Sequence, residues 1–314
     1  MKIAVLMDPL SKLDLKKDTT LAIISEACGR QWQCAYFTLH DLYAQDGEAF
    51  AKLTPIVVDA DAIHWEEGTP AVRALATMDI ILIRKDPPFD LAYLYATQLL
   101  ELAEQAGVLV SNKPQSLRNH NEKLSLLQHP NLCAPTLVSM DMTRLREFWH
   151  TYGSVVLKPL DSMGGGSIFH VPADGANLNV ILETLTAQGT RHIMAQQYIP
   201  ELTLTGDKRI ILIDGEPIPY ALARFPKAGE SRANLAAGGS GQVVSITERD
   251  RFLCEALKPK LQAHALHFVG LDVIGDYVTE INVTSPTCAR QIAAETDLNI
   301  VGRYLDVLAG LLDR

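Results

Sequence analysis

The sequence predicts an α/β protein of two parts, an open parallel sheet followed by an α+β region. Up to about residue 120, short apolar runs alternate with helical patterns, whereas strands follow one another more closely in the remainder. The length of 314 residues also exceeds the size at which one hydrophobic core usually stops growing. We therefore expect one domain over residues 1–122 and a second over residues 123–314, around a shared cleft.

The first part has the alternation of a parallel sheet. Helical spacing of Leu21, Ile24 and Cys28 predicts one helix, and residues 90–106 predict another. The sequence contains neither a Gly-x-Gly-x-x-Gly turn after the first strand nor a Gly-x-x-x-x-Gly-Lys-Ser/Thr loop, so we expect this sheet to bind something other than a nucleotide. Apolar runs predict its strands at residues 3–7, 35–37, 56–58, 80–83 and 108–110.

The second part mixes strands and helices. Helices are predicted over residues 177–188 and 247–266, a hairpin over residues 270–282, and a closing helix whose apolar stripe includes Tyr304 and Leu308. This stripe is better explained by core packing than by a partner surface. Strands are predicted at residues 155–157, 168–171, 193–198, 209–213 and 218–224.

Composition restricts the classes of partner. Lys and Arg number 28 against 37 Asp and Glu, and the net charge of -9 disfavours nucleic acid and anionic membrane surfaces. The first apolar run is too short for a signal peptide, and no run is long enough to span a bilayer, so we expect a cytoplasmic protein. Five cysteines without a Cys-x-x-Cys pair favour reduced thiols.

A glycine run after a strand gives the strongest local signal. Lys158 ends a predicted strand, and Gly164, Gly165, Gly166 and Ser167 precede the next one. Glycines let backbone amides approach phosphate oxygens, and a lysine adds positive charge, so this loop is a candidate phosphate site. An ordinary hairpin with a surface lysine explains these residues equally well.

The hairpin carries candidate metal ligands. Glu280 and Asn282 share one face of a strand, and Asp272 joins them if residues 275–277 form a three-residue loop, which we expect. A two-residue turn predicts that Asp272 faces the other way. Hard oxygen ligands suit magnesium or manganese and not zinc, although a solvated acidic strand is the alternative.

A long, small and polar segment at residues 226–241 predicts a mobile lid, with a tolerated surface loop as the alternative. Arg232 and Asn234 inside it are candidates to close onto an anion and exclude water. Arg209 and Arg224 are strand-end cations, a position more often solvated than catalytic.

Residues 84–90 follow the fourth predicted strand, where open α/β sheets bind ligands, and a cis-proline or rigid turn is the competing explanation. The histidines lack ligand spacing, and Cys288 has no companion base, so neither supports a catalytic role.

Taken together, these segments resemble a known family. The Asn121-Glu122-Lys123 segment, the Lys158 loop and the Asp272 hairpin resemble the ATP-grasp fold. Residues 84–90, 112–118, 234–239 and 280–287 are similar to the signatures of bacterial glutathione synthetases, and they span nearly the whole chain.

The resemblance implies a role for each group of residues. It implies ATP between two antiparallel sheets, a lid subdomain over about residues 123–200, and two Mg²⁺ or Mn²⁺ ions. The nucleotide would be bound by Lys123, Lys158, Gly164, Gly165, Gly166, Ser167, Gln196, Gln197, Tyr198, Ile199 and Asp207. The metal ligands would be Asp272, Glu280 and Asn282; the catalytic residues Arg209, Arg224, Arg232 and Asn234; and the substrate-binding residues Arg84, Lys85, Asp86 and Ser285.

The resemblance also implies a reaction. The carboxylate of γ-glutamylcysteine would attack the γ-phosphate of ATP, and the amine of glycine would then displace phosphate from the acyl phosphate. The resemblance further implies that the protein is a homotetramer. Two alternatives remain open: another ATP-grasp carboxylate–amine ligase, such as a D-alanine ligase or a glutamate-adding ligase, and a non-catalytic nucleotide-binding module.

Overall fold

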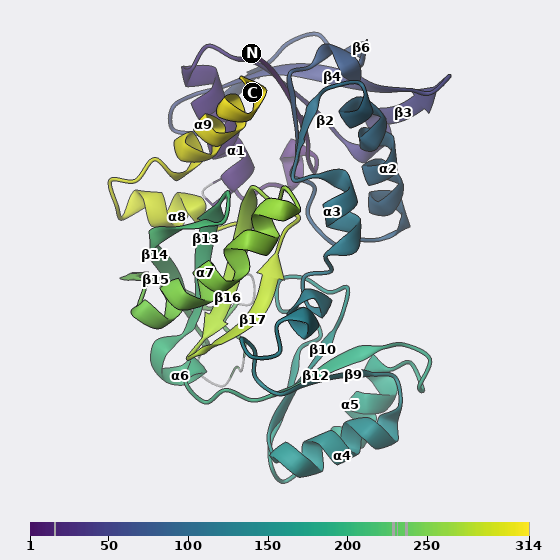
Figure 1. Cartoon of the computed structure of the whole chain (residues 1–314), viewed down its shortest axis with the longest axis vertical. Helices are drawn as coiled ribbons and strands as arrows, with labels where there is room; N and C mark the ends of the chain where they lie inside the picture. The colour runs from purple at the N-terminus through teal and green to yellow at the C-terminus, as the bar shows by residue number, and fades with distance from the viewer. Residues whose placement is uncertain (16, 228–229, 231, 236–237, 314) are drawn as a thin grey trace.

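The computed structural model describes residues 1–15, 17–227, 230, 232–235 and 238–313. In this part of the chain, three sheets follow one another along the long axis of the molecule (Figure 1). The elements of the N-terminal sheet lie at one end and a small four-stranded sheet lies at the other, with a five-stranded sheet between them.

The centre of the N-terminal sheet is parallel, as predicted. Its strands β1 (Lys2–Leu6), β2 (Gln33–Phe37), β7 (Ile80–Ile83) and β8 (Leu109–Ser111) pair in the order β2-β1-β7-β8. Helices α1 (Thr19–Gly29) and α2 (Leu91–Gln105) confirm the two predicted helices, and a short helix α3 (Pro114–Asn119) follows β8. The carboxylates of Asp18 and Asp90 cap α1 and α2 by accepting hydrogen bonds from backbone amides.

The outer part of this sheet corrects the prediction of an open parallel sheet. Strand β4 (Glu48–Val58) pairs antiparallel with β2, and β3 (Leu42–Gln45), β5 (Trp65–Glu67) and β6 (Ala71–Ala74) pair antiparallel with β4. The sheet is therefore mixed. In the first half of β4, Phe50 and Leu53 are separated by an alanine and a lysine, so only the apolar end at residues 56–58 was recognised as a strand.

The four-stranded sheet forms a small unit with its own core. Its antiparallel strands are β9 (Thr136–Ser139), β10 (Val155–Pro159), β11 (Phe169–Val171) and β12 (Ile193–Gln197), in the order β11-β10-β12-β9. Helices α4 (Met142–Tyr152) and α5 (Leu178–Leu185) accompany it. Leu145, Leu157 and Leu182 belong to its separate hydrophobic cluster, which we interpret as the core of the predicted lid.

The five-stranded sheet is also antiparallel, so the predicted pair of antiparallel sheets is confirmed. Its order is β15 (Ser240–Ser245), β14 (Glu216–Phe225), β13 (Asp207–Ile213), β16 (Phe268–Ile274) and β17 (Tyr277–Asn282). Helix α7 (Glu248–Ala263) packs against β14, and a short helix α6 (Leu202–Thr205) precedes β13. The first residues of β15 fall within the segment predicted as a lid.

The β16–β17 hairpin differs from its predicted geometry. Ile274 pairs with Tyr277, so the turn has two residues and the predicted three-residue loop is wrong. Asp272 nevertheless pairs with Glu280, because a β-bulge on β17 leaves Thr279 as an extra residue. The bulge restores the register that the loop was expected to provide.

The C-terminal helices pack between the N-terminal part of the chain and the five-stranded sheet. Helix α8 (Ala289–Ala294) leads to α9 (Ile300–Leu312), which packs against α1 and β13 and lies close to the N-terminus (Figure 1). The Tyr304 hydroxyl lies 2.7 Å from Ser111 Oγ, and its ring packs on Phe268. Among the described residues, no helix has the length and apolar character needed to cross a membrane. Short 3₁₀ helices span Leu10–Lys12, Leu39–Asp41, Leu75–Thr77 and Leu124–Gln128.

Candidate active site

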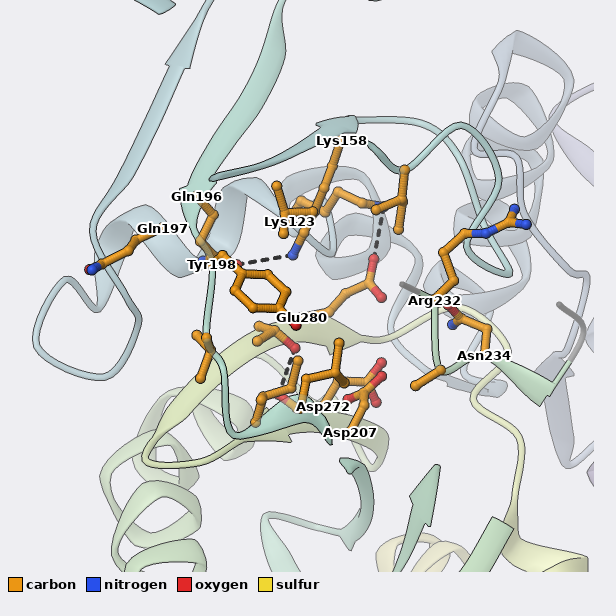
Figure 2. A pocket seen from close by; sticks show the side chains of 17 residues that line it. Lys123, Lys158, Gln196, Gln197, Tyr198, Asp207, Arg232, Asn234, Asp272 and Glu280 are labelled. Carbon is orange, nitrogen blue, oxygen red and sulfur yellow. Dashed lines mark hydrogen bonds and ion pairs between the residues drawn. The ribbon is translucent and has the colours of Figure 1, made fainter. Parts of the chain in front are cut away.

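A cavity of about 680 Å³ lies between the two antiparallel sheets (Figure 2). Val156 and Ile168 from the four-stranded sheet region, and Ile199, Leu202 and Ile274 from the opposite side, give it apolar walls. Its polar residues include two lysines and three carboxylates. A site with apolar walls and charged groups suits a ligand that has a flat apolar ring and an anionic end.

Two lysines lie on one side of this cavity. Lys123 Nζ is 2.8 Å from Glu280 Oε1 and donates a hydrogen bond to the Ser162 carbonyl. Lys158 Nζ donates to the side-chain oxygen of Gln196 at 3.0 Å, and burial lowers the pKa of Lys158. Because the described partner of Lys158 is a neutral amide, an anion can bind this lysine without displacing a carboxylate.

The segment from Gln196 to Ile199 lines the cavity beside the lysines. Gln196 Nε2 donates to Thr136 Oγ1, and the Tyr198 amide donates to the Ser154 carbonyl at 2.9 Å. The Tyr198 ring stacks on His170, with the ring centroids 4.1 Å apart. These contacts fix the backbone that leaves β12 for the five-stranded sheet.

Four charged side chains from β13, β14 and β16 form a buried network on the opposite side, where Figure 2 labels its two carboxylates, Asp207 and Asp272. Arg209 binds Asp272 with two hydrogen bonds, at 2.5 and 3.0 Å. Arg224 Nη2 lies 2.6 Å from Asp207 Oδ2 and 3.0 Å from Asp272 Oδ2. Burial alone raises the pKa of Asp272, but the two arginines outweigh it and hold that pKa well below its usual range.

Asp207 has one oxygen that is available to a ligand. Its Oδ1 is buried and accepts no hydrogen bond from the described residues, although Oδ2 is paired with Arg224. Burial raises the pKa of Asp207 to about 6, against the opposing effect of Arg224. A buried oxygen without a donor is costly, so a hydroxyl donor supplied by a ligand stabilises this position.

The candidate metal ligands lie on one face of the hairpin. Asp272 pairs with Glu280, and Gly270 pairs with Asn282, whose side-chain amide donates to the Gly270 carbonyl at 3.1 Å. Among the described residues, no group of three or more His, Cys, Asp or Glu side chains could hold a metal by itself. Two carboxylates and an amide oxygen fit Mg²⁺ or Mn²⁺ when phosphate oxygens and water complete the coordination.

The glycine loop meets the segment predicted as a lid. Arg232 Nη1 donates to the Gly165 carbonyl at 3.3 Å, and Arg232 also pairs with Glu230 at 2.6 Å. Gly165 has φ of +80°, and a Cβ at this position would lie 2.5 Å from Asn234 Oδ1, so the contact requires glycine. Gly166 and Ser167 belong to the same turn. The predicted lid also includes residues 228–229, 231 and 236–237, which lie outside the described residues.

A second cavity of about 820 Å³ adjoins the first and shares Glu280 and Asn234 with it. Its lining brings together Arg209 and Arg224 from the charge network with Gly164 from the glycine loop. Asp86, Asn282, Ser285 and Cys288 also line it. The two cavities therefore meet where the lysines, the arginines and the candidate metal ligands converge.

The predicted substrate residues divide into two pairs. Asp86 and Ser285 line the second cavity, and burial raises the pKa of Asp86. Arg84 and Lys85 do not line it: the Arg84 guanidinium is buried, donates to the Pro286 carbonyl at 2.9 Å, and lies over the Phe268 ring. Lys85 pairs with Asp8 at 3.1 Å. These two cations hold the loops around the cavity together.

Sequence reasoning gave no individual role to Glu122. The residue lines the second cavity, and its Oε1 accepts hydrogen bonds from Val283 and Thr284, directly after β17. Its position beside Lys123 in the motif was visible in the sequence. The pairing with Val283 and Thr284 was not, because it joins residues about 160 positions apart.

Comparison with solved structures shows the family of folds to which the chain belongs. D-cycloserine synthetase superposes with a TM-score of 0.70 at 14% identity, covering 99% of both chains. An ATP-grasp ligase solved with a minimal precursor, magnesium and ADP gives a TM-score of 0.63 at 17% identity, and the match covers 100% of this chain and 98% of that one. The fold is that of the ATP-grasp ligases.

The particular family follows from the sequence comparisons. Residues 1–118 match the N-terminal domain of prokaryotic glutathione synthetase, and residues 122–297 match its ATP-grasp domain. Glutathione synthetase of Pseudomonas syringae pv. tomato is 51% identical over 98% of this chain and 96% of its own length. That of Shewanella oneidensis is 49% identical over 98% of both chains. The chain belongs to the prokaryotic glutathione synthetase family and is an ATP-dependent ligase.

Proposed function

We propose that this chain joins γ-glutamylcysteine to glycine and converts ATP into ADP and phosphate, giving glutathione. The observation that carries the proposal is the meeting of the two cavities at Glu280, between two lysines and two buried arginines. The full-length similarity to glutathione synthetases supports these substrates.

The first cavity fits ATP. Its apolar walls accept the adenine ring beside residues 196–199, and Asp207 Oδ1 accepts a ribose hydroxyl. Lys123 and Lys158 then bind the phosphates, with residues 164–167 covering them. The unpartnered Asp207 oxygen supports this orientation, since it lies opposite the lysines (Figure 2).

Asp272, Glu280 and Asn282 would hold two Mg²⁺ or Mn²⁺ ions, with the remaining ligands supplied by ATP and water. The ions supply neutralisation of the phosphoryl charge. In the free protein, Glu280 is paired with Lys123, and Asp272 is paired with Arg209 and Arg224. Metal binding would replace these ion pairs with bonds from the two carboxylates to the ions. The lysine and the two arginines are then free to face the phosphates.

The second cavity fits γ-glutamylcysteine, with Asp86 and Ser285 contacting the peptide. We place its cysteinyl carboxylate beside Arg209 and Arg224, where it can attack the γ-phosphate of ATP and release ADP. The arginines stabilise the transferring charge because they are fixed before the reaction begins. Arg232 and Asn234 then limit access of water to the acyl phosphate.

We also propose that the protein is cytoplasmic and forms a homotetramer. Family membership supports both. Light scattering of the purified protein measures the assembly directly, and a monomer of 34.5 kDa at micromolar concentration contradicts it.

The test of function is an incubation with γ-glutamylcysteine, glycine, ATP and magnesium, with each omitted in turn. The proposal predicts glutathione by mass only when all four are present, with one ADP released for each product. ADP release with D-alanine in place of both amino-acid substrates supports another ATP-grasp ligase. Nucleotide binding without ADP release supports a non-catalytic module.

A further inference from the structure

Glu122 lies at the border of two cavities. It lines the second cavity and also a third one, of about 630 Å³, together with Thr284 and Pro87. The third cavity shares Lys123 with the ATP cavity. A ligand in the third cavity therefore reaches the same central region as ATP and the peptide.

The Glu122 carboxylate is held in one orientation. Its Oε1 accepts hydrogen bonds from the amides of Val283 and Thr284, at 2.9 and 3.1 Å, and from the Thr284 hydroxyl at 2.8 Å. Its backbone carbonyl accepts a further bond from Ile281 at 2.9 Å. Three donors on Oε1 leave Oε2 as the oxygen that can meet a ligand in the cavities.

This carboxylate has no cationic partner among the described residues. The neighbouring Lys123 ammonium is 2.8 Å from Glu280 instead. Burial raises the pKa of Glu122, and the charge of Glu280 raises it further. A partly buried carboxylate beside a second carboxylate is unfavourable, and a cation brought by a ligand reduces that cost.

We propose that Glu122 Oε2 binds the ammonium group of the incoming amino acid, which occupies the third cavity. The inference rests on the proposed function and names the subsite for its second substrate. An amine held there faces the junction of the three cavities, where the acyl phosphate forms. Lys123 lines both this cavity and the ATP cavity, and we assign its ammonium group to the phosphates.

The subsite discriminates by charge. A primary ammonium donates up to three hydrogen bonds and carries the positive charge that Glu122 lacks in the protein. Hydroxylamine is a nucleophile that is largely uncharged at neutral pH, so it reacts with an acyl phosphate without needing this carboxylate. The two nucleophiles therefore separate amine binding from phosphoryl transfer.

The test compares Glu122→Gln with Glu122→Asp. Gln keeps an oxygen for the amides of Val283 and Thr284 but removes the charge, so the melting temperature should stay close to that of the wild type. We expect the KM for glycine to rise by about 10- to 100-fold, as for loss of a hydrogen bond to a charged group. The KM values for ATP and γ-glutamylcysteine should change less than about twofold, and Asp should restore part of the glycine affinity.

The second measurement replaces glycine with hydroxylamine and follows hydroxamate formation from γ-glutamylcysteine and ATP. Wild type and Glu122→Gln should form hydroxamate at similar rates. Equal loss with both nucleophiles overturns the inference, because Glu122 then supports β17 or phosphoryl transfer. If Gln prevents folding, an unchanged KM for glycine in Glu122→Asp, together with unchanged hydroxamate formation, overturns it as well. No hydroxamate from the wild type contradicts the proposed function itself.

Discussion

The two sides of the ATP cavity are built differently. The floor includes Asp207 and Asp272, which line the cavity and form buried ion pairs with Arg209 and Arg224; the side chains of Arg209 and Asp272 are 7% and 3% exposed. The roof includes residues 232–234, which line the cavity. Arg232 donates a long hydrogen bond to the Gly165 carbonyl, and its side chain is 32% exposed. Water screens the roof but not the floor. The difference supports the proposal that the floor is preorganised for the reaction and that the roof adjusts to the ligand.

Arg209→Ala should have the largest effect, because it removes half of a buried pair in the floor. We expect turnover to fall by about 10³-fold, as for loss of a fixed donor to a transferring anion. ATP affinity should change much less, because Lys123 and Lys158 remain. Steady-state kinetics and nucleotide titration give the two values.

Stability provides the control for that variant. The remaining Asp272 charge keeps only Arg224, so the free energy of unfolding should fall by about 3 kcal/mol. Arg249→Ala, which removes an exposed arginine bound to the Asp276 carbonyl, should leave turnover unchanged. Wild-type turnover in Arg209→Ala excludes this arginine from the mechanism.

Glu280→Gln should have the next largest effect, on metal-dependent nucleotide binding. Gln lacks the charge that a divalent ion requires, and Lys123 loses its 2.8 Å partner. We expect affinity for ADP in the presence of magnesium to fall by about 100-fold, as for loss of a metal-linked contact. The magnesium-free affinity should not decrease, and a magnesium-dependent gain equal to that of the wild type rules Glu280 out as a ligand.

Arg232→Ala tests the roof and should have a smaller effect. Its ion pair with Glu230 is partly exposed, so folding stability should change little. Because the roof limits access of water, ADP release in the absence of glycine should rise several-fold relative to glutathione formation. If the ratio of ADP release to glutathione formation is the same as in the wild type, Arg232 has no role in excluding water.

The smallest expected effect is a pH dependence of ADP affinity that arises from the Asp207 carboxyl group. Its folded pKa of about 6 lies above the usual value, so protonation stabilises the free protein as pH falls through 6, and this gain is absent at higher pH. A ribose hydroxyl binds the ionised carboxylate, so ADP affinity should weaken roughly fourfold between pH 7.5 and 5.5. Asp207→Asn should remove this part of the pH dependence, and comparison of the two proteins cancels the titration of the nucleotide. Identical pH profiles contradict the role of Asp207.

The two antiparallel sheets were expected only from the resemblance to the ATP-grasp fold. The parallel centre was predictable from the sequence itself, because apolar periodicity reports burial directly. β3, β5 and β6 were not, since short exposed strands at a sheet edge carry little apolar pattern. The Asp272–Glu280 pairing was predicted with the wrong turn. A bulge at Thr279 depends on local hydrogen bonding, which alternation alone does not reveal.

The site shows the same limit. The motifs predicted which residues gather near the cavities, but not their ion pairs, such as Arg224 with both Asp207 and Asp272. Nor did they separate Arg84, which is buried under the loops, from Asp86, which lines the second cavity. These distinctions arise from contacts between distant segments, such as Arg84 with Pro286.

The most direct measurement follows oxygen atoms through the reaction. γ-Glutamylcysteine labelled with ¹⁸O in the cysteinyl carboxylate is converted with ATP and glycine, and the phosphate and glutathione are analysed by mass. Transfer of the carboxylate's oxygen to the γ-phosphate predicts one ¹⁸O in each phosphate released and one in the new amide. Phosphate without ¹⁸O contradicts an acyl phosphate formed over the arginine floor.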